Sequence, residues 1–128
     1  MPMVTKGFKQ LLAEANAAVD VISAHDAVQL MGRDDVVFID VRESEERARG
    51  TIPTSVHAPR GFLEFVADPE GPMHHPAFAS GRRLVVFCGS GGRSTLASKT
   101  LHDMGLRNVA NLAGGFQAWV QAGGEVTG

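Results

Sequence analysis

The residue with the clearest chemical potential is the single cysteine, Cys88, which opens the run Cys88-Gly89-Ser90-Gly91-Gly92-Arg93-Ser94. The apolar stretch Leu84-Val85-Val86-Phe87 precedes it, and a segment of helical composition follows. A thiol between a buried strand and a helix start lies where backbone N–H groups and the positive end of the helix dipole gather. Such surroundings bind anions and lower the pKa of a thiol. The sequence therefore predicts a reactive thiolate at Cys88, not a small buried apolar side chain.

The residues after the cysteine have the properties of an anion cradle. We expect Arg93 to supply its cation, because a guanidinium fork matches anionic oxygens. The N–H groups of Gly89, Ser90, Gly91 and Gly92 can converge on the Cys88 sulfur. Ser94 can serve either as a residue of the helix start or as a ligand of the sulfur.

Hydrophobic periodicity and turn residues predict the elements that hold this loop. Strands are expected over 36–39, 55–58, 84–87 and 109–112, and helices over 8–18, 24–31, 43–49, 94–104 and 115–122. Between them, the segment 60–80 is irregular, and residues 59–76 are expected to form a surface excursion with a helical patch inside it. Strands that alternate with helices imply a parallel α/β sheet, whose ligands bind beyond the carboxyl ends of the strands. Both Cys88 and Asp40 follow such a strand.

The composition sets the class of protein. The chain has 128 residues, of which 44% are hydrophobic, and this suits one globular domain. Its 12 basic and 14 acidic residues favour neither a nucleic-acid nor a membrane partner. We find no apolar run of membrane-spanning length and no signal peptide, so a cytoplasmic location is expected. One cysteine cannot form an internal disulfide, which agrees with a reducing compartment.

Four residues separate Cys88 from Arg93, whereas tyrosine-phosphatase-type loops place five between their cysteine and arginine. The shorter loop resembles the active loop of the rhodanese sulfurtransferases. Two more motifs are similar to that family: Phe38-Ile39-Asp40-Val41-Arg42-Glu43 with its charged continuation to Pro53, and Leu112-Ala113-Gly114-Gly115-Phe116-Gln117-Ala118-Trp119. Together the three motifs cover roughly residues 20–127. The departures are Thr51, where the family usually has His, and Thr54, where it usually has Gly. The segment 60–80 is also longer than in the most compact single-domain members, and it can form one wall of the pocket.

The resemblance implies a rhodanese-like three-layer α/β domain, with a central, mainly parallel sheet of about five strands and helices on both faces. We expect this domain over residues 20–128, with residues 1–19 as an N-terminal helical extension packed on it. The implied activity is transfer of a sulfane sulfur from a donor such as thiosulfate, through a persulfide on Cys88. Cyanide, a thiol or a protein would accept the sulfur. No cofactor is implied, and the protein is expected to be a monomer or a homodimer.

Three other residues are expected to support the loop. By the resemblance, Asp40 and Arg42 brace the active loop and its neighbouring turns. Arg60 can either enter the pocket to contact an anionic donor or lie exposed on the surface. The pair His74-His75 suggests a metal site. No further ligands lie at a suitable spacing from these histidines, so no metal is expected.

Two other functions stay open at this point. One is a phosphatase or an arsenate reductase built on a related loop, against which the four-residue spacing argues. The other is a binding or sensing module of the same fold, in which Cys88 reports redox state or carries sulfur for a partner. Composition does not separate this second function from catalysis.

Overall fold

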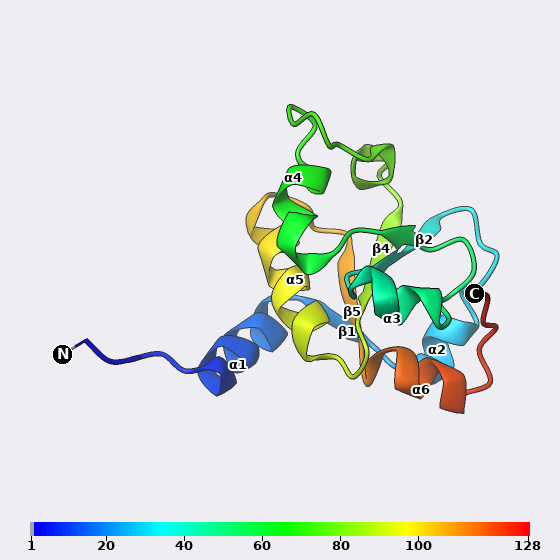
Figure 1. Cartoon of the computed structure of the whole chain (residues 1–128), viewed down its shortest axis with the longest axis horizontal. Coiled ribbons are helices and arrows are strands. Elements are labelled where there is room, and N and C mark those ends of the chain that lie inside the picture. Colours follow the sequence, from blue (N-terminus) through cyan, green and yellow to red (C-terminus); the bar gives the residue numbers. More distant parts are fainter. Residues whose placement is uncertain (1) are drawn as a thin grey trace.

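A computed structural model describes residues 2–128 and places a five-stranded sheet at the centre of the chain (Figure 1). All four strand pairings are parallel, and the order is β1-β5-β4-β2-β3. The strands are β1 (Asp20–Ile22), β2 (Val36–Asp40), β3 (Val56–His57), β4 (Arg83–Phe87) and β5 (Val109–Leu112). The helices are α1 (Phe8–Ala18), α2 (Ala24–Val28), α3 (Ser44–Ala48), α4 (Leu63–Ala67), α5 (Gly92–Asp103) and α6 (Gly115–Gln121), with short 3₁₀ helices η1 (Arg60–Phe62) and η2 (Pro76–Ala79).

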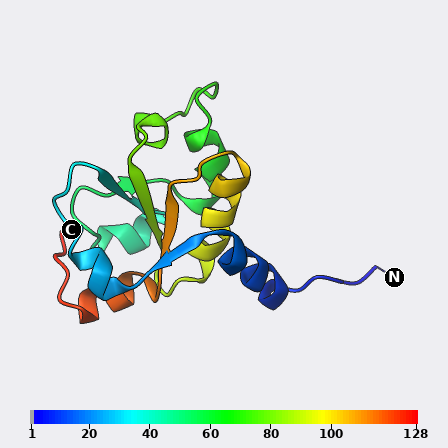
Figure 2. The ribbon, with the colours of Figure 1, turned by 180° about the vertical axis from the view of Figure 1, so that it is seen from behind.

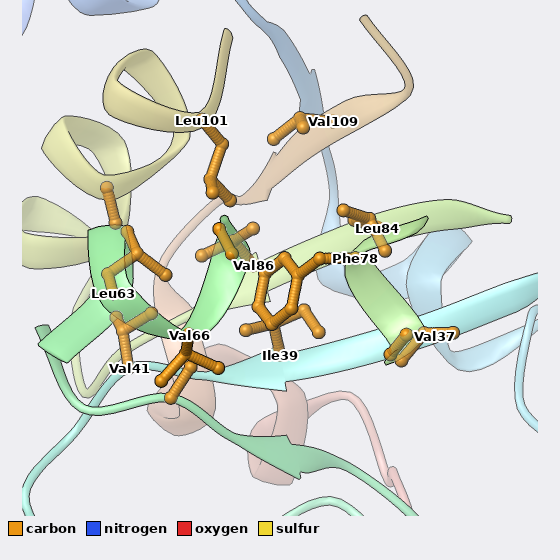
Figure 3. Packing of buried hydrophobic residues seen from close by; sticks show 14 of the residues in the cluster. Val37, Ile39, Val41, Leu63, Val66, Phe78, Leu84, Val86, Leu101 and Val109 are labelled. Carbon is orange, nitrogen blue, oxygen red and sulfur yellow. The ribbon is translucent and has the colours of Figure 1, made fainter. Parts of the chain in front are cut away.

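Both faces of the sheet are buried, which confirms the expected three-layer α/β fold. Side chains alternate along β2: Val37 and Ile39 enter one core, and Phe38 enters the other. The first core packs against α4 and α5, and Figure 3 shows its aliphatic side chains around Phe78. The second core lies under α2 and α6 and includes Trp119, whose ring meets Phe38 edge-on at 5.2 Å between centroids.

The N-terminal helix α1 packs against α5, outside the sheet layers. It buries only Ala15 completely, and Phe8 near its start is 66% exposed. The chain before α1 extends away from the body (Figures 1 and 2). Residues 8–18 are helical as expected, and this helix contacts α5.

Two expectations about local structure are wrong. The helix expected over 24–31 ends at Val28, because the N–H groups of the next three residues bond to carbonyls three residues back and so form tighter turns. The excursion over 60–80 is not confined to the surface: its apolar residues enter the first core, among them Leu63, Val66 and Phe78. The sheet also has a strand that the sequence does not predict, β1, which adds an edge beside β5.

Candidate functional site

Cys88 follows β4 directly and is 1% exposed. The Gly91 N–H donates to its Sγ at 3.1 Å, in a turn where Gly91 has φ +114°. Burial raises the pKa of the Cys88 thiol, but hydrogen bonds from the Ser94 hydroxyl and from the N–H groups of Ser94, Gly91 and Ser90 outweigh it. The net pKa lies below the ordinary value of a cysteine. The loop therefore stabilises a thiolate.

Backbone N–H groups at the amino end of α6 bind the carbonyl groups of the cysteine loop. The Phe116 N–H donates to the Cys88 carbonyl at 2.8 Å, and the Gln117 N–H donates to the Gly89 carbonyl at 3.1 Å. Gly115 brings these donors close at φ +62°, and a Cβ on it would lie 2.6 Å from the Cys88 carbonyl oxygen. The Gly114-Gly115 pair is thus the support on which the cysteine loop rests.

Arg93 leaves the loop toward α3. Its Nη1 and Nη2 donate to the two Glu46 carboxylate oxygens at 2.7 and 2.8 Å. Hydrogen bonds from Arg93 are the largest cause that lowers the pKa of Glu46, to about 2. The Arg93 pKa is raised chiefly by Glu46 and further by the Cys88 sulfur, so the guanidinium faces both groups. Arg93 therefore lies beside Cys88 as a cation, already engaged by a carboxylate.

Sequence reasoning missed Glu46, although a local signal existed. Its carboxylate accepts the Glu43 N–H at 3.0 Å and so completes a capping box at the start of α3. That pattern predicts a fixed carboxylate on this helix. It does not predict the partner Arg93, which lies 47 residues further along the chain.

Asp40 and Arg42 form a buried ion pair at the carboxyl end of β2. The Arg42 Nε and Nη2 each donate to Asp40 at 3.0 Å, and Nη2 also donates to the Gly50 carbonyl at 2.7 Å. The guanidinium stacks 4.4 Å from the centroid of the Phe116 ring. Burial raises the pKa of Asp40, but hydrogen bonds from Arg42 and Thr51 lower it by more. The net pKa of Asp40 is therefore below the ordinary value of an aspartate. The ion pair thus connects β2 to the turn after α3 and to α6, the helix whose amino end supports the cysteine loop.

The turn after α3 contains the two departures from the family pattern. The Thr51 hydroxyl donates to Asp40 Oδ2 at 2.8 Å. Thr54 has φ +65° and is the single non-glycine residue with positive φ among residues 2–128. The turn therefore keeps its tie to Asp40 through Thr51, whereas Thr54 holds a strained backbone that glycine would adopt freely.

Arg60, His74 and His75 have their contacts outside the cysteine loop. Arg60 donates to the Glu64 carboxylate at 3.1 Å and to the Thr100 hydroxyl at 3.2 Å, so it links η1 to the carboxyl-terminal part of α5. His75 accepts the Ala77 N–H at 3.1 Å through Nδ1 and caps η2, while the buried Nδ1 of His74 has no hydrogen-bond partner in the described part of the chain. Within residues 2–128 we find no group of three or more histidine, cysteine or acidic side chains arranged to hold a metal ion.

Two hollows border the cysteine loop. One, of about 270 Å³, lies beside Gly89 and is lined by charged side chains, Arg42, Glu46 and Arg49. The other, of about 300 Å³, lies beside Ser90, Gly91 and Gly92 and is lined by uncharged residues, including Leu12 and Asn16 of α1. Residues 60–80 line neither hollow, so the irregular segment does not form a wall of these two hollows.

The parallel sheet and the cysteine loop together match one protein family. The family model for the rhodanese-like domain matches residues 23–122, and the chain belongs to this family. Among curated relatives, a protein named as a putative mitochondrial thiosulfate sulfurtransferase from Schizosaccharomyces pombe is 37% identical over 95 residues, which are 69% of this chain and 66% of that one. The thiosulfate:glutathione sulfurtransferase of Saccharomyces cerevisiae is 33% identical over 110 residues, 80% of this chain and 79% of that one.

A solved structure extends the similarity to the whole chain. A protein of unknown function from Rhodopseudomonas palustris, named as a possible tyrosine phosphatase, superposes with a TM-score of 0.93 at 44% identity and covers 99% of both chains. Its match includes α1, which lies outside the family model. Membership of the rhodanese-like family rests on the family model, and the curated relatives are sulfurtransferases of that family. Among residues 2–128 no helix has the length and apolarity that crossing a membrane requires.

Proposed function

We propose that the chain is a sulfurtransferase in which Cys88 carries the sulfur as a persulfide. The single observation that carries the proposal is the Gly91 N–H bond to Cys88 Sγ at 3.1 Å, at the carboxyl end of β4. This donor, with the Ser94 hydroxyl and the positive end of α5, stabilises an anionic sulfur. The names of the relatives supply thiosulfate as donor and glutathione as one acceptor.

The proposed cycle has two displacements. The Cys88 thiolate attacks the outer sulfur of thiosulfate; a new S–S bond forms, the S–S bond of thiosulfate breaks, and sulfite leaves with its electron pair. An acceptor, such as cyanide or the thiolate of glutathione, then attacks the outer sulfur of the persulfide, and Cys88 leaves as a thiolate. The carried sulfur is bound covalently to the enzyme, so the cycle needs no metal and no organic cofactor.

Supporting roles follow from the positions of the charged residues. Arg93 would bind the sulfonate oxygens of the donor, since its guanidinium lies beside Cys88. The N–H groups of the Gly89 to Gly92 turn would hold the outer sulfur. Asp40 and Arg42 would act through the turn and Phe116. For Arg60, which lines neither hollow, contact with an anionic donor and a position on the surface both stay predictions. A cytoplasmic location and a monomeric or homodimeric state also stay predictions.

Mass spectrometry after thiosulfate treatment tests the proposal. The wild-type chain is expected to gain one sulfur atom, mapped to the peptide that contains Cys88, and the gain is expected to vanish on incubation with cyanide or glutathione. Cys88→Ser is the matched control and should gain none. A wild-type chain that gains no sulfur would refute the proposal.

Two alternatives are separated by the same preparations. The name of the Rhodopseudomonas palustris relative makes phosphatase activity the first, and hydrolysis of an aryl phosphate that is lost in Cys88→Ser would support it. A sulfur-carrying or sensing module is the second. It is supported if the persulfide forms and no small acceptor removes it.

A further inference from the structure

The hollow of about 270 Å³ beside the cysteine loop, here called the charged hollow, has one arginine in its lining without a counter-charge. Of its charged lining residues, Arg42 is paired with Asp40 at 3.0 Å, and Glu46 is paired with Arg93 at 2.7 Å. Arg49 is exposed, and its guanidinium forms no ion pair and no hydrogen bond within residues 2–128. The charges of the other two lining residues are thus compensated, and the hollow keeps the positive charge of Arg49.

The position of Arg49 on α3 explains why no carboxylate of the chain binds it. Arg49 is the C-cap of α3 and follows Glu46 by three residues, a spacing that places two side chains on the same side of a helix. Both Glu46 oxygens already accept from Arg93, at 2.7 and 2.8 Å, and one of them also accepts the Glu43 N–H. The planar fork of Arg49 is therefore available to a carboxylate from outside the chain.

The charged hollow is fixed to the backbone of the cysteine loop. Phe116 and Gln117 line it, and their N–H groups donate to the carbonyls of Cys88 and Gly89 at 2.8 and 3.1 Å. Its volume of about 270 Å³ lies just below the range of about 300–1,000 Å³ of pockets that enclose a drug-sized ligand. The hollow therefore suits one end of a small molecule whose other end lies at Cys88.

We propose that the charged hollow binds a carboxylate of the sulfur acceptor through Arg49, so that the preferred acceptors are acidic thiols. This inference rests on the proposed sulfur transfer and names the class of acceptor. The donor has its sulfonate bonded directly to the sulfur that it delivers, so its anion must bind beside Cys88; the Arg93 guanidinium lies there, 3.3 Å from where a Cβ on Gly89 would be. An acceptor with a carboxylate several bonds from its thiol needs a cation further out, which Arg49 supplies. Arg49 takes part in no bond that forms or breaks, and it raises the affinity for an acidic thiol over that for an uncharged one.

Equilibrium binding of S-methylglutathione, measured by isothermal titration calorimetry, tests the site without the reaction. This probe keeps the carboxylates of glutathione but has no free thiol, so it cannot accept sulfur. Arg49→Gln is expected to weaken its binding about fivefold to tenfold, because a charge-assisted hydrogen bond to an exposed guanidinium is lost. The diethyl ester of the probe should bind the wild-type chain more weakly by a similar factor, and its binding should not change in Arg49→Gln. Arg83→Gln is the matched control: it removes the same charge at the start of β4, the end of that strand remote from Cys88, and should bind the probe as wild type does.

Steady-state kinetics test whether this binding serves the sulfur acceptor. With glutathione, Arg49→Gln should raise the KM about fivefold to tenfold and leave kcat within about twofold of wild type, whereas its rates with cyanide should not change. Equal binding of the probe to Arg49→Gln and wild type, no binding to wild type, or an unchanged KM for glutathione would each overturn the proposal. If the probe binds through Arg49 but thiosulfate leaves no sulfur on Cys88, the proposed function and the acceptor role fail together, and the carboxylate site stands without them.

Discussion

Gly115 is the position at which a single methyl group tests how the cysteine loop is held. A Cβ there would lie 2.6 Å from the Cys88 carbonyl oxygen and 2.7 Å from both the carbonyl carbon and oxygen of Gly89. These atoms belong to the backbone of the loop, so no side chain can rotate away to make room. Gly115→Ala must either push the loop off the amino end of α6 or distort that helix.

The magnitude follows from two costs and one gain. An alanine at φ +62° costs about 1–2 kcal/mol, and overpacking against the loop costs about 1–3 kcal/mol. Alanine also restricts the unfolded chain more than glycine does, and this stabilises the folded state by about 0.4–1 kcal/mol. Gly115→Ala is therefore expected to lower the free energy of unfolding by about 2–4 kcal/mol.

Gly123 offers a matched control, because it has φ +83° and a Cβ on it would meet no atom of residues 2–128 within 4 Å beyond its chain neighbours. Gly123→Ala bears only the backbone cost and is expected to lower the free energy of unfolding by about 1 kcal/mol. Urea denaturation at neutral pH compares the two variants, and thiosulfate treatment measures persulfide formation in each. Gly115→Ala should lose persulfide formation while still folded, and Gly123→Ala should keep it. Equal stabilities with equal persulfide formation would refute the role of Gly115 as support of the loop.

Three further substitutions test the surrounding turn and ion pairs. Thr54→Gly should raise the free energy of unfolding by about 0.5–1 kcal/mol in urea denaturation, because glycine adopts positive φ without strain; an unchanged or lower stability would count against strain at this turn. Glu46→Gln should lower stability by about 1 kcal/mol at pH 7, a value discounted for the partial exposure of Arg93. Because Arg93 lowers the pKa of Glu46 from 4.5 to about 2, this contribution is complete above pH 4.5 and is lost as the pH falls through about 2, so denaturation curves of the two proteins should converge there. Asp40→Asn should lower the midpoint of thermal unfolding and the free energy of unfolding, the latter by about 3 kcal/mol, since Arg42 is left buried without a counter-charge; a loss below about 1 kcal/mol would show that this pair does not hold the turn.

The sheet and its two cores could be predicted because the strands carry their signal locally. Both faces of β2 and β4 are covered, so each strand appears as a continuous apolar run bounded by polar residues. The edge strand β1 lacks that signal: it has three residues, and Asp20 and Val21 are exposed. Its place depends on pairing with β5, a long-range contact that a pattern of neighbouring residues does not contain.

The helix expected over 24–31 failed for a related reason. Its apolar residues beyond Val28 pack against the second core from a turn, and an apolar side chain at helical spacing satisfies that core equally well from either conformation. The irregular segment over 60–80 shows the converse. Its proline and glycine residues indicate turns correctly, but they conceal Phe78, which fills the first core from η2.

At the candidate site, spacing along the chain predicts which residues share the loop but not the direction in which each side chain leaves it. The spacing predicts an Arg93 that awaits an anion, and its fork is instead filled by Glu46. An anionic donor that binds Arg93 must therefore displace that carboxylate or share its hydrogen bonds. Because the Glu46 carboxylate is also tied to the Glu43 N–H, its departure would loosen the start of α3. In the proposed cycle, the affinity of Arg93 for a donor would then be the difference between two similar ion pairs. Glu46 would thus set how firmly Arg93 holds a donor and would keep the guanidinium beside Cys88 when no donor is bound.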